Sequence, residues 1–332
     1  MNKLLLFFIF TWVIILSACK PNKDKAENDS SKETPKKIEN KPAILFDASK
    51  AEMSANADWV IDADVFNLGY NNSGQMVEGK SNEANPQRLP TPSQDKITKE
   101  TVETYWTGAL SAWAIDCVKE GFRVETLPYN GRISFGDKSN DQDLSNYKVF
   151  VMDEPNIRFS KDEKKALMDF VDAGGGLFMI ADHDKSDRNR DGWDSPNIWN
   201  DFIKVKEIPF QFDLISISQT SNHFTRTTNP ITDGKYGRPK EIKFSAGTQM
   251  HLYDGAEPIV VTRQSKTSKS GVMMAASRFG KGRIAALGDS SPTDDGTGDI
   301  NDKLYRGYTG EVNGHHRKLL MNTIIWLAQK EK

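Results

Sequence analysis

Apolar residues in the region 43–332 occur in short runs that end at acidic residues or glycines. A run of about four to eight apolar residues between turn signals is typical of a buried strand. Residues 122–127 alternate between apolar and polar side chains, which also indicates a strand. The pattern therefore predicts strands over 43–47, 122–127, 148–153, 177–181, 259–261 and 282–289.

Other segments repeat their apolar residues with helical spacing. Between Trp106 and Val118 the apolar positions follow one another at steps of three and one, which indicates one buried helix face ending at Gly121. Ser160 and Glu163 have the spacing of a capping box, which predicts a helix from there to the glycines at 174–176. Further helices are expected over 196–202 and 314–329. Strands alternating with helices predict an α/β fold with a mainly parallel sheet. Residues 202–280 are expected to form less regular β-rich insertions in the same domain.

The chain begins with a different pattern. Residues 4–18 are almost wholly apolar, and residues 20–42 are mostly charged or polar. A short apolar run behind a positive start is typical of a secretory signal; the alternative is a lone anchor helix. The end of the run, Leu16-Ser17-Ala18-Cys19, resembles a bacterial lipobox. We therefore expect a lipoprotein signal peptide over 1–18, a lipidated Cys19 with a disordered polar tether over 19–42, and one folded domain over 43–332.

This organisation predicts a cell-envelope protein held to a lipid membrane through Cys19. Lys20, in place of an aspartate, favours the outer membrane. The formal net charge is −2, so there is no basic surface to suggest nucleic-acid binding, and 37% hydrophobic residues suffice for a core. With Cys19 lipidated, Cys117 is left without a disulfide partner, and its place on an apolar helix face predicts burial.

The segment from Glu163 to His183 resembles the class I glutamine-amidotransferase-like fold, and specifically its trehalose-utilisation-like branch. An acid-starting helix, a glycine turn at 174–176 and a strand ending near His183 carry the resemblance. Further segments resemble later parts of that branch: the strand 282–289, the pair His315-His316 with 319–327, and the segments 222–223 and 229–231. The resemblance implies a flavodoxin-like, doubly wound sheet. Asp182-His183-Asp184 stands where amidotransferases carry a nucleophilic cysteine, which excludes glutamine hydrolysis by a thiolate.

Four predicted strands end in polar clusters. These are Asp47, Asp153-Glu154, Asp182-His183-Asp184 and Asp289-Ser290. Because the carboxyl ends of parallel strands meet at one edge, the clusters are expected to converge on a crevice suited to a divalent cation or to acid/base chemistry. The alternative is that each acid caps the helix after its strand. We assign catalysis to Asp182, His183, Asp184 and Asp289, and substrate binding to Asp47, Asp153, Glu154 and Ser290.

The segment Asp187-Arg188-Asn189-Arg190-Asp191-Gly192 has the spacing of the first half of a calcium loop. It predicts Ca²⁺ ligands at Asp187, Asn189 and Asp191, with Arg188 and Arg190 pointing away from the ion. The twelfth position is Ile198, so a complete EF-hand is excluded. The alternative is a loop held by Asx-turn hydrogen bonds.

Other residues admit two interpretations each. Trp193 and Trp199 could form an aromatic wall for a ligand or pack in the core. The acidic loop 294–299 could supply ligands to the site or form a solvated turn. His315 and His316 could point into the crevice or lie at the surface. Ser290 would act as a nucleophile only if His183 lay within hydrogen-bond reach. The leading hypothesis is a metal-dependent hydrolase for an extracytoplasmic substrate, such as a glycan or small molecule. The rival is a non-catalytic binding lipoprotein with a calcium-stabilised loop.

Overall fold

Five parallel strands form the centre of the fold in a computed structural model of the chain. The model describes residues 41–54, 57–63, 68–73, 75–78, 93–204, 208–225, 227–262, 271–296, 307–310 and 315–331. In spatial order the parallel strands are β6 (Arg123–Leu127), β1 (Ala43–Asp47), β7 (Val149–Asp153), β8 (Gly176–Ile180) and β16 (Gly282–Leu287). Counted along the chain this order is 2-1-3-4-5, the flavodoxin-like arrangement, so the predicted α/β fold is confirmed.

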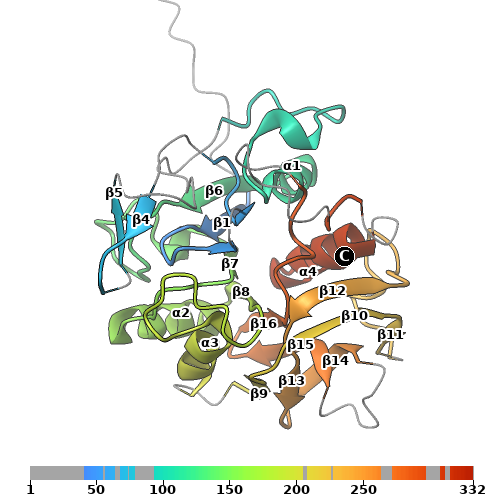
Figure 1. Cartoon of the computed structure of the whole chain (residues 1–332). Helices are drawn as coiled ribbons and strands as arrows, with labels where there is room; N and C mark the ends of the chain where they lie inside the picture. The colour runs from blue at the N-terminus through green and yellow to red at the C-terminus, as the bar shows by residue number, and fades with distance from the viewer. Residues whose placement is uncertain are drawn as a thin grey trace, which may run out of the picture. The chain divides into compact units, whose positions relative to one another are not determined.

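The sheet continues past β16 with antiparallel strands (Figure 1). These are β15 (Val272–Phe279), β14 (Ala256–Val261) and β11 (His223–Phe224), while β13 (Met250–Leu252) pairs with β15 and β9 (Phe210–Phe212) pairs with β13. Among the described residues, three strand pairs lie outside this sheet: β10 (Ile217–Ser221) with β12 (Ile242–Gly247), β2 (Met53–Ser54) with β3 (Ala57–Asp58), and β4 (Leu68–Tyr70) with β5 (Met76–Glu78). The β-rich character expected of 202–280 is present.

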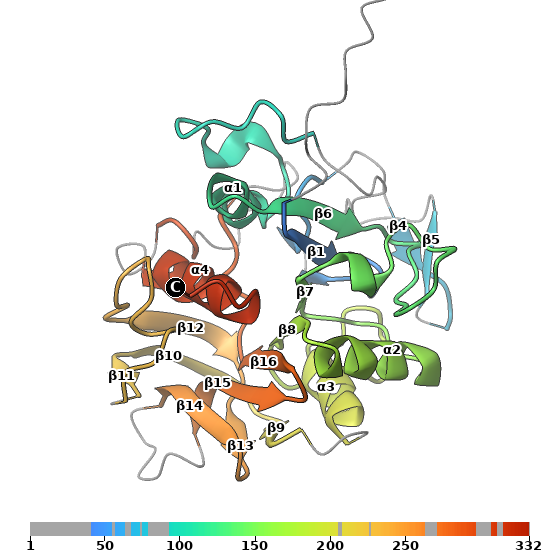
Figure 2. The same cartoon turned by 180° about the vertical axis from the view of Figure 1, so that it is seen from behind.

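Helices cover both faces of the parallel strands (Figures 1 and 2). On one face lie α1 (Ser111–Lys119) and α4 (His315–Leu327), and on the other α2 (Lys161–Asp172) and α3 (Ser195–Ile203). Two short 3-10 turns, Glu103–Tyr105 and Leu144–Asn146, complete the described helices. Successive residues of β7 alternate between the two core clusters, because strand side chains point to opposite faces.

The capping box at the start of α2 is confirmed. The Ser160 side chain accepts from the Glu163 amide, and the Glu163 carboxylate accepts from the Ser160 amide. The predicted start of α1 is wrong, because the helix begins at Ser111 rather than near Trp106. Backbone hydrogen bonds from Gly108 and Leu110 to residues 60 and 61 hold the preceding segment out of the helix.

Candidate functional site

Acidic side chains converge where the central parallel strands end. In the sheet register Asp153 lies opposite Ile180, and Ile180 lies opposite Leu287. The residues at or just beyond these paired positions therefore leave the sheet at the same edge. The acids placed there are Asp153, Glu154, Asp182 and Asp289, all of them buried. The expected convergence of three of the four strand-end clusters is thus present.

Glu154 lies at the centre of this group on a left-handed turn. Its φ is +51°, a conformation that few residues other than glycine adopt, and its side chain is fully buried. Trp59 Nε1 and Ser290 Oγ both donate to Glu154 Oε2, at 2.9 and 2.8 Å. Arg188 Nε donates to Oε1 at 3.0 Å. Three side chains from separate parts of the chain therefore fix both oxygens of one carboxyl group.

Arg188 joins two of the acids. Its Nη2 donates to Asp182 Oδ2 at 2.8 Å while its Nε contacts Glu154. The Arg188 backbone amide donates to Asn156 Oδ1, and the Asn156 amide group donates in turn to the carbonyl of Glu154. Arg188 thus reaches from the 187–194 loop into the acid cluster, which its position in the sequence does not reveal.

Burial changes the acidity of the cluster. It raises the pKa of Glu154 to about 8, and that of both Asp182 and Asp289 to about 7. Neighbouring carboxylates raise the pKa of Glu154 and of Asp182 further, and Arg188 opposes the rise in both. The pKa of Asp153 also lies well above its ordinary value because of burial. The cluster therefore gains and loses protons near neutral pH, as general acids and bases must.

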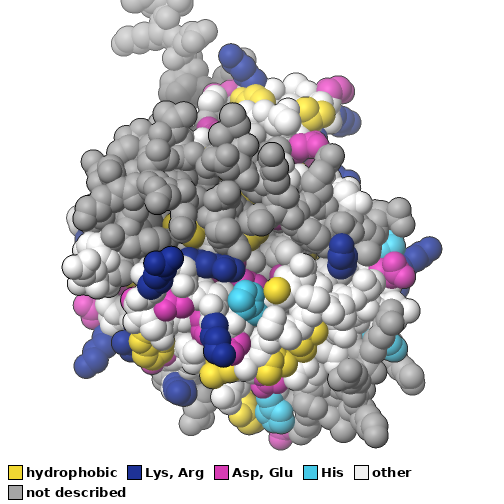
Figure 3. All heavy atoms as spheres, viewed as in Figure 1, with side chains coloured by type: hydrophobic (Ala, Val, Ile, Leu, Met, Phe, Trp, Pro, Cys, Tyr) yellow, Lys and Arg dark blue, Asp and Glu magenta, His cyan; other side chains and the backbone are white. Residues whose placement is uncertain are grey.

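His183 lies beside the buried acids with part of its side chain exposed. Its Nε2 lies 3.6 Å from Asp182 Oδ2, and its Nδ1 is 2.5 Å from the backbone oxygen of Asp184. The Asp184 carboxylate lies 3.8 Å from the Lys185 ammonium at the surface, so it does not enter the cluster. Basic, acidic and histidine side chains gather on this face near β8 and α3 (Figure 3). His183 is thus placed at the solvent side of the site.

Asp289 is held by the elements around the end of β16. Its Oδ1 accepts from the Ser291 amide and hydroxyl, and its Oδ2 accepts from the Ser245 amide at 2.5 Å. The preceding residue must be glycine, because a Cβ at Gly288 would lie 2.0 Å from the Thr248 carbonyl oxygen. The close approach of these backbones fixes where the Asp289 carboxylate points.

Two hydroxyls complete the cluster. Thr293 Oγ1 donates to Asp153 Oδ2 at 2.6 Å. Ser290 donates to Glu154, so the hydroxyl proton of Ser290 faces a carboxyl group rather than His183. The Ser–His contact on which a serine triad depends is therefore not among the hydrogen bonds of the described residues.

Asp47, the remaining strand-end acid, forms a neighbouring buried pair with Glu52. Asp47 Oδ1 accepts from the Ser49 amide and hydroxyl, and the Glu52 carboxylate accepts from the Lys50 amide. Burial raises the pKa of both acids, and the charge of Asp47 raises that of Glu52 further. Asp47 thus pairs with an acid that follows it closely in sequence.

The 187–194 loop uses its side-chain oxygens for hydrogen bonds within the loop. Asp187 accepts from the backbone amides of Asp191 and Gly192, at 3.1 and 2.8 Å. Asn189 accepts from the Asp191 amide, and Asp191 from the Trp193 amide. These are the Asx-turn contacts of the alternative interpretation. The Ca²⁺ assignment of Asp187, Asn189 and Asp191 stays a prediction.

The candidate tryptophans and the acidic loop 294–299 make contacts within the fold. Trp199 is buried and its Nε1 donates to the Ile180 carbonyl, while Trp193 stacks with the Arg158 guanidinium at 3.7 Å. Asp295 Oδ2 accepts from the Ala112 amide in the first turn of α1, so this acid of the 294–299 loop is a buried contact. The rest of that loop, 297–299, lies outside the described residues.

The histidine pair and the single internal cysteine are also buried. His316 Nε2 accepts from the Lys243 amide, and its Nδ1 contacts the Gly307 carbonyl, while burial lowers its pKa to about 4. His315 Nδ1 accepts from the Glu241 amide. Cys117 is buried, as expected, and burial raises its pKa well above the ordinary value. The two histidines thus join the start of α4 to β12 and to the segment before it.

Within the described ranges, no group of three or more His, Cys, Asp or Glu is arranged to hold a metal ion. Arg188 supplies the positive charge between Glu154 and Asp182. The described residues as they stand therefore do not fit a resident divalent ion at the cluster. No helix in this part of the chain is long and apolar enough to cross a membrane, and Cys19 lies outside it.

Comparison with known proteins adds likenesses of fold only. No family model and no curated protein matches the chain. Similar solved structures include a cytoplasmic protein from Salmonella typhimurium (12% identity, TM-score 0.46, covering 86% of this chain and 98% of that one). They also include ThuA-like proteins from Bacteroides uniformis (13%, 0.39, 90% and 97%) and Parabacteroides merdae (11%, 0.42, 88% and 91%). Likenesses at these TM-scores say nothing about activity.

Sequence reasoning missed the residues that hold the strand-end acids. Several of them come from segments distant in sequence, and no motif assigns them this role. The missed residues are Glu52, Trp59, Asn156, Arg188, Ser245 and Thr293. A pattern search could have singled out Arg188 and Arg190 alike, as basic residues inside an otherwise acidic loop.

Proposed function

We propose that the domain is a hydrolase whose acid/base pair is Glu154 and Asp182. One observation carries the proposal. Two buried carboxyl groups at the ends of neighbouring parallel strands share one arginine, and their pKa values lie near neutrality. Burying acids in this way destabilises a fold, and strongly shifted pKa values are typical of sites that transfer protons. A site that only bound a neutral ligand would not need them.

The pair divides the work of hydrolysis by position. Asp182, beside the partly exposed His183, takes a proton from a water molecule, and the water oxygen attacks the electrophilic carbon of the substrate. Glu154, whose pKa burial raises, gives its proton to the departing oxygen, so the bond to the leaving group breaks without releasing an alkoxide. Arg188 balances the charge on whichever carboxyl group is ionised. His183 lies on the exposed side of Asp182, where it would contact the substrate.

The proposed substrate is an extracytoplasmic glycan. The signal and lipobox pattern of residues 1–19 supports the extracytoplasmic compartment. The sequence resemblance to trehalose-utilisation-like proteins, a branch of the amidotransferase-like fold, supports a glycan as the substrate class. No step of the scheme uses a metal ion. A divalent ion at the cluster would have to displace the Arg188 guanidinium, so metal dependence remains a separate proposal, tested by turnover after chelation.

The experiment is a hydrolysis screen with the full chain. Oligosaccharides and chromogenic glycosides and esters are offered to the wild type, to Glu154→Gln and Asp182→Asn, and to Asp141→Asn as an exposed control. We expect both site variants to lose at least about a hundredfold of any turnover, and the control to lose none. Ligand binding without turnover of any substrate class would favour the binding-lipoprotein alternative and overturn the hydrolase.

We also propose that the protein is anchored to the outer membrane through acylated Cys19. Cells fed a labelled fatty acid should label the wild type and Cys117→Ser, and should not label Cys19→Ser. Cys117→Ser is the matched control because Cys117 is the other cysteine of the chain. Equal labelling of the Cys19→Ser variant would contradict the anchor.

A further inference from the structure

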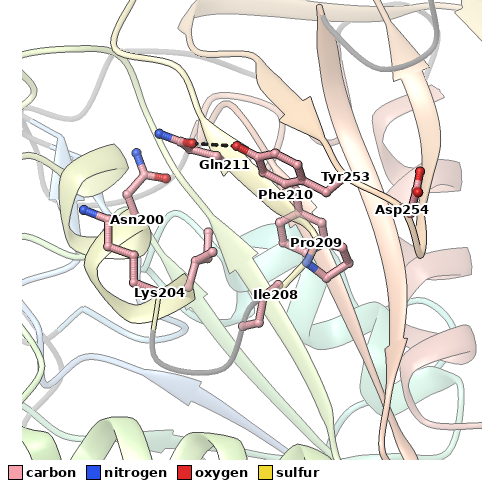
Figure 4. Close-up of a pocket in the computed structure, with 9 residues that line it drawn as sticks. Asn200, Lys204, Ile208, Pro209, Phe210, Gln211, Tyr253 and Asp254 are labelled. Atoms are coloured by element: carbon pink, nitrogen blue, oxygen red, sulfur yellow. Dashed lines mark hydrogen bonds between the residues drawn. The ribbon is translucent and has the colours of Figure 1, made fainter.

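A pocket at the far end of α3 is separate from the acid cluster. It has a volume of about 560 Å³ and lies between the end of α3 and the strands β9 and β13. Figure 4 shows Asn200 and Lys204 on the helix side of the pocket, with Pro209, Gln211 and Tyr253 across from them. A cavity of this size accommodates a small ligand or part of a longer one.

Tyr253 presents a fixed aromatic ring at this pocket. The residue is 50% exposed, which is unusual for a large aromatic side chain on a folded domain. Its hydroxyl donates to Gln211 Oε1 at 3.1 Å, and the His251 ring packs against it edge-on with centroids 5.1 Å apart. The Tyr253 amide also donates to the Pro209 carbonyl. The ring is therefore held in place while half of it faces solvent.

The pocket walls are fastened together. Asn200 donates to the Phe212 carbonyl at 2.8 Å and accepts from the Phe212 amide at 2.9 Å, which joins α3 to β9. A preformed pocket binds with less loss of conformational freedom than one that must be ordered. The charged side chains on the lining are one lysine and one aspartate, Lys204 and Asp254, so the lining carries no net charge. This balance favours a neutral ligand over an anion or a cation.

We infer that this pocket is a secondary binding subsite for a neutral oligosaccharide. A pyranose ring has a face of C–H groups that packs on an aromatic ring and a rim of hydroxyls that bond to amide groups. Tyr253 supplies the ring and Gln211 the amide. The inference rests on the proposed function for its meaning, since it names the substrate class of the same hydrolase.

The position of the pocket also predicts the length of the ligand. Helix α3 begins at Ser195, next to the loop that supplies Arg188, and has nine residues. Its rise is about 1.5 Å per residue, so the pocket residues Asn200 and Lys204 lie roughly 8 and 13 Å farther along this helix. A monosaccharide does not span that separation. The subsite therefore serves substrates of several sugar units.

The test is direct binding of soluble neutral oligosaccharides of three to six units, such as cello-, manno- and chito-oligosaccharides, measured by calorimetry on the intact protein. At least one series should bind the wild type. Tyr253→Ala should weaken that binding about tenfold, and Tyr253→Phe, which keeps the ring, should weaken it much less. Tyr105→Ala is the matched control, because Tyr105 also bonds through its hydroxyl but lies elsewhere, and should leave binding unchanged.

The outcomes separate this inference from the proposed function. Glu154→Gln should still bind the oligosaccharide even if turnover is lost. Absence of binding in every series, or equal affinity of Tyr253→Ala and the wild type, would overturn the subsite whether or not the hydrolase screen succeeds. Thermal unfolding of each variant checks that a loss of binding is not a loss of folding.

Discussion

At the scale of the residue, the site depends on one strained and buried glutamate. Glu154 adopts a left-handed backbone that costs roughly 1–3 kcal/mol for a residue other than glycine. Its carboxyl group is fully buried, which disfavours its charged form. Contacts from Trp59, Arg188 and Ser290 offset part of this cost. Such an arrangement is expected where a proton must be held ready for transfer.

The raised pKa of Glu154 has a defined effect on stability. The unfolded chain ionises near the ordinary value of 4.5, whereas the folded protein keeps the proton up to about pH 8. The contribution of this group is therefore fully present below pH 4.5 and is lost as the pH rises toward 8. Glu154→Gln removes this dependence, so the variant should gain stability relative to the wild type between pH 5 and 8, by at most about 1.4 kcal/mol per unit of pKa difference. Urea unfolding at these two pH values measures it, and an unchanged pH slope would contradict the burial argument.

Substitutions of Arg188, which supplies the positive charge, test the same site. Arg188→Ala leaves Glu154 and Asp182 without their shared cation, and should lower the free energy of unfolding by about 3 kcal/mol at neutral pH. Arg188→Lys keeps a charge but loses the fork that reaches both acids, so it should lose less. If denaturant unfolding showed Arg188→Ala to be as stable as the wild type, the ion pairs of Arg188 with Glu154 and Asp182 would not stabilise the fold.

At the scale of the element, local signals predicted well wherever local contacts decide the structure. The α2 capping box needs only Ser160 and Glu163, and both hydrogen bonds are present. The start of α1 was misjudged because backbone contacts with residues 60 and 61 decide it. An apolar stripe cannot indicate such a distant partner. The same limitation hid Arg188 and Trp59, whose roles depend on how loops cross the ends of the strands.

The 187–194 loop either binds calcium or is held by hydrogen bonds within the loop, and thermal unfolding separates the two cases. Asp187 accepts two backbone amides, so Asp187→Ala should lower the melting temperature without any metal. On the Asx-turn interpretation, millimolar Ca²⁺ or a chelator leaves the melting temperature of the wild type unchanged. A rise with Ca²⁺ that is absent in Asp187→Ala would instead establish the loop as a calcium site. Thermal scans of both proteins with Ca²⁺ and with chelator decide between them.

At the scale of the whole molecule, the layered fold creates the chemistry of the site. The segments that supply Trp59, Arg188 and Ser245 cross the strand ends and contact the buried acids that three parallel strands bring together. The sequence predicted the α/β fold and the strand-end acids, because apolar runs closed by acids mark both. It did not predict the pairing of Asp47 with Glu52, or the exposed Tyr253 pocket, because both depend on how loops fold back. The predicted signal and tether span residues 1–42, of which 1–40 lie outside the described residues, and both stay a prediction.

Titration of the carboxyl groups in the intact protein tests the central claim most directly. Carbon-13 NMR of the aspartate and glutamate carboxyls across pH 4–9, with Glu154→Gln and Asp182→Asn for assignment, reads the protonation of the pair without any substrate. We predict titrations near pH 8 for Glu154 and near pH 7 for Asp182, each lost in its own variant. Titration of both groups below about pH 5, as for ordinary exposed acids, would contradict an acid/base pair at this site.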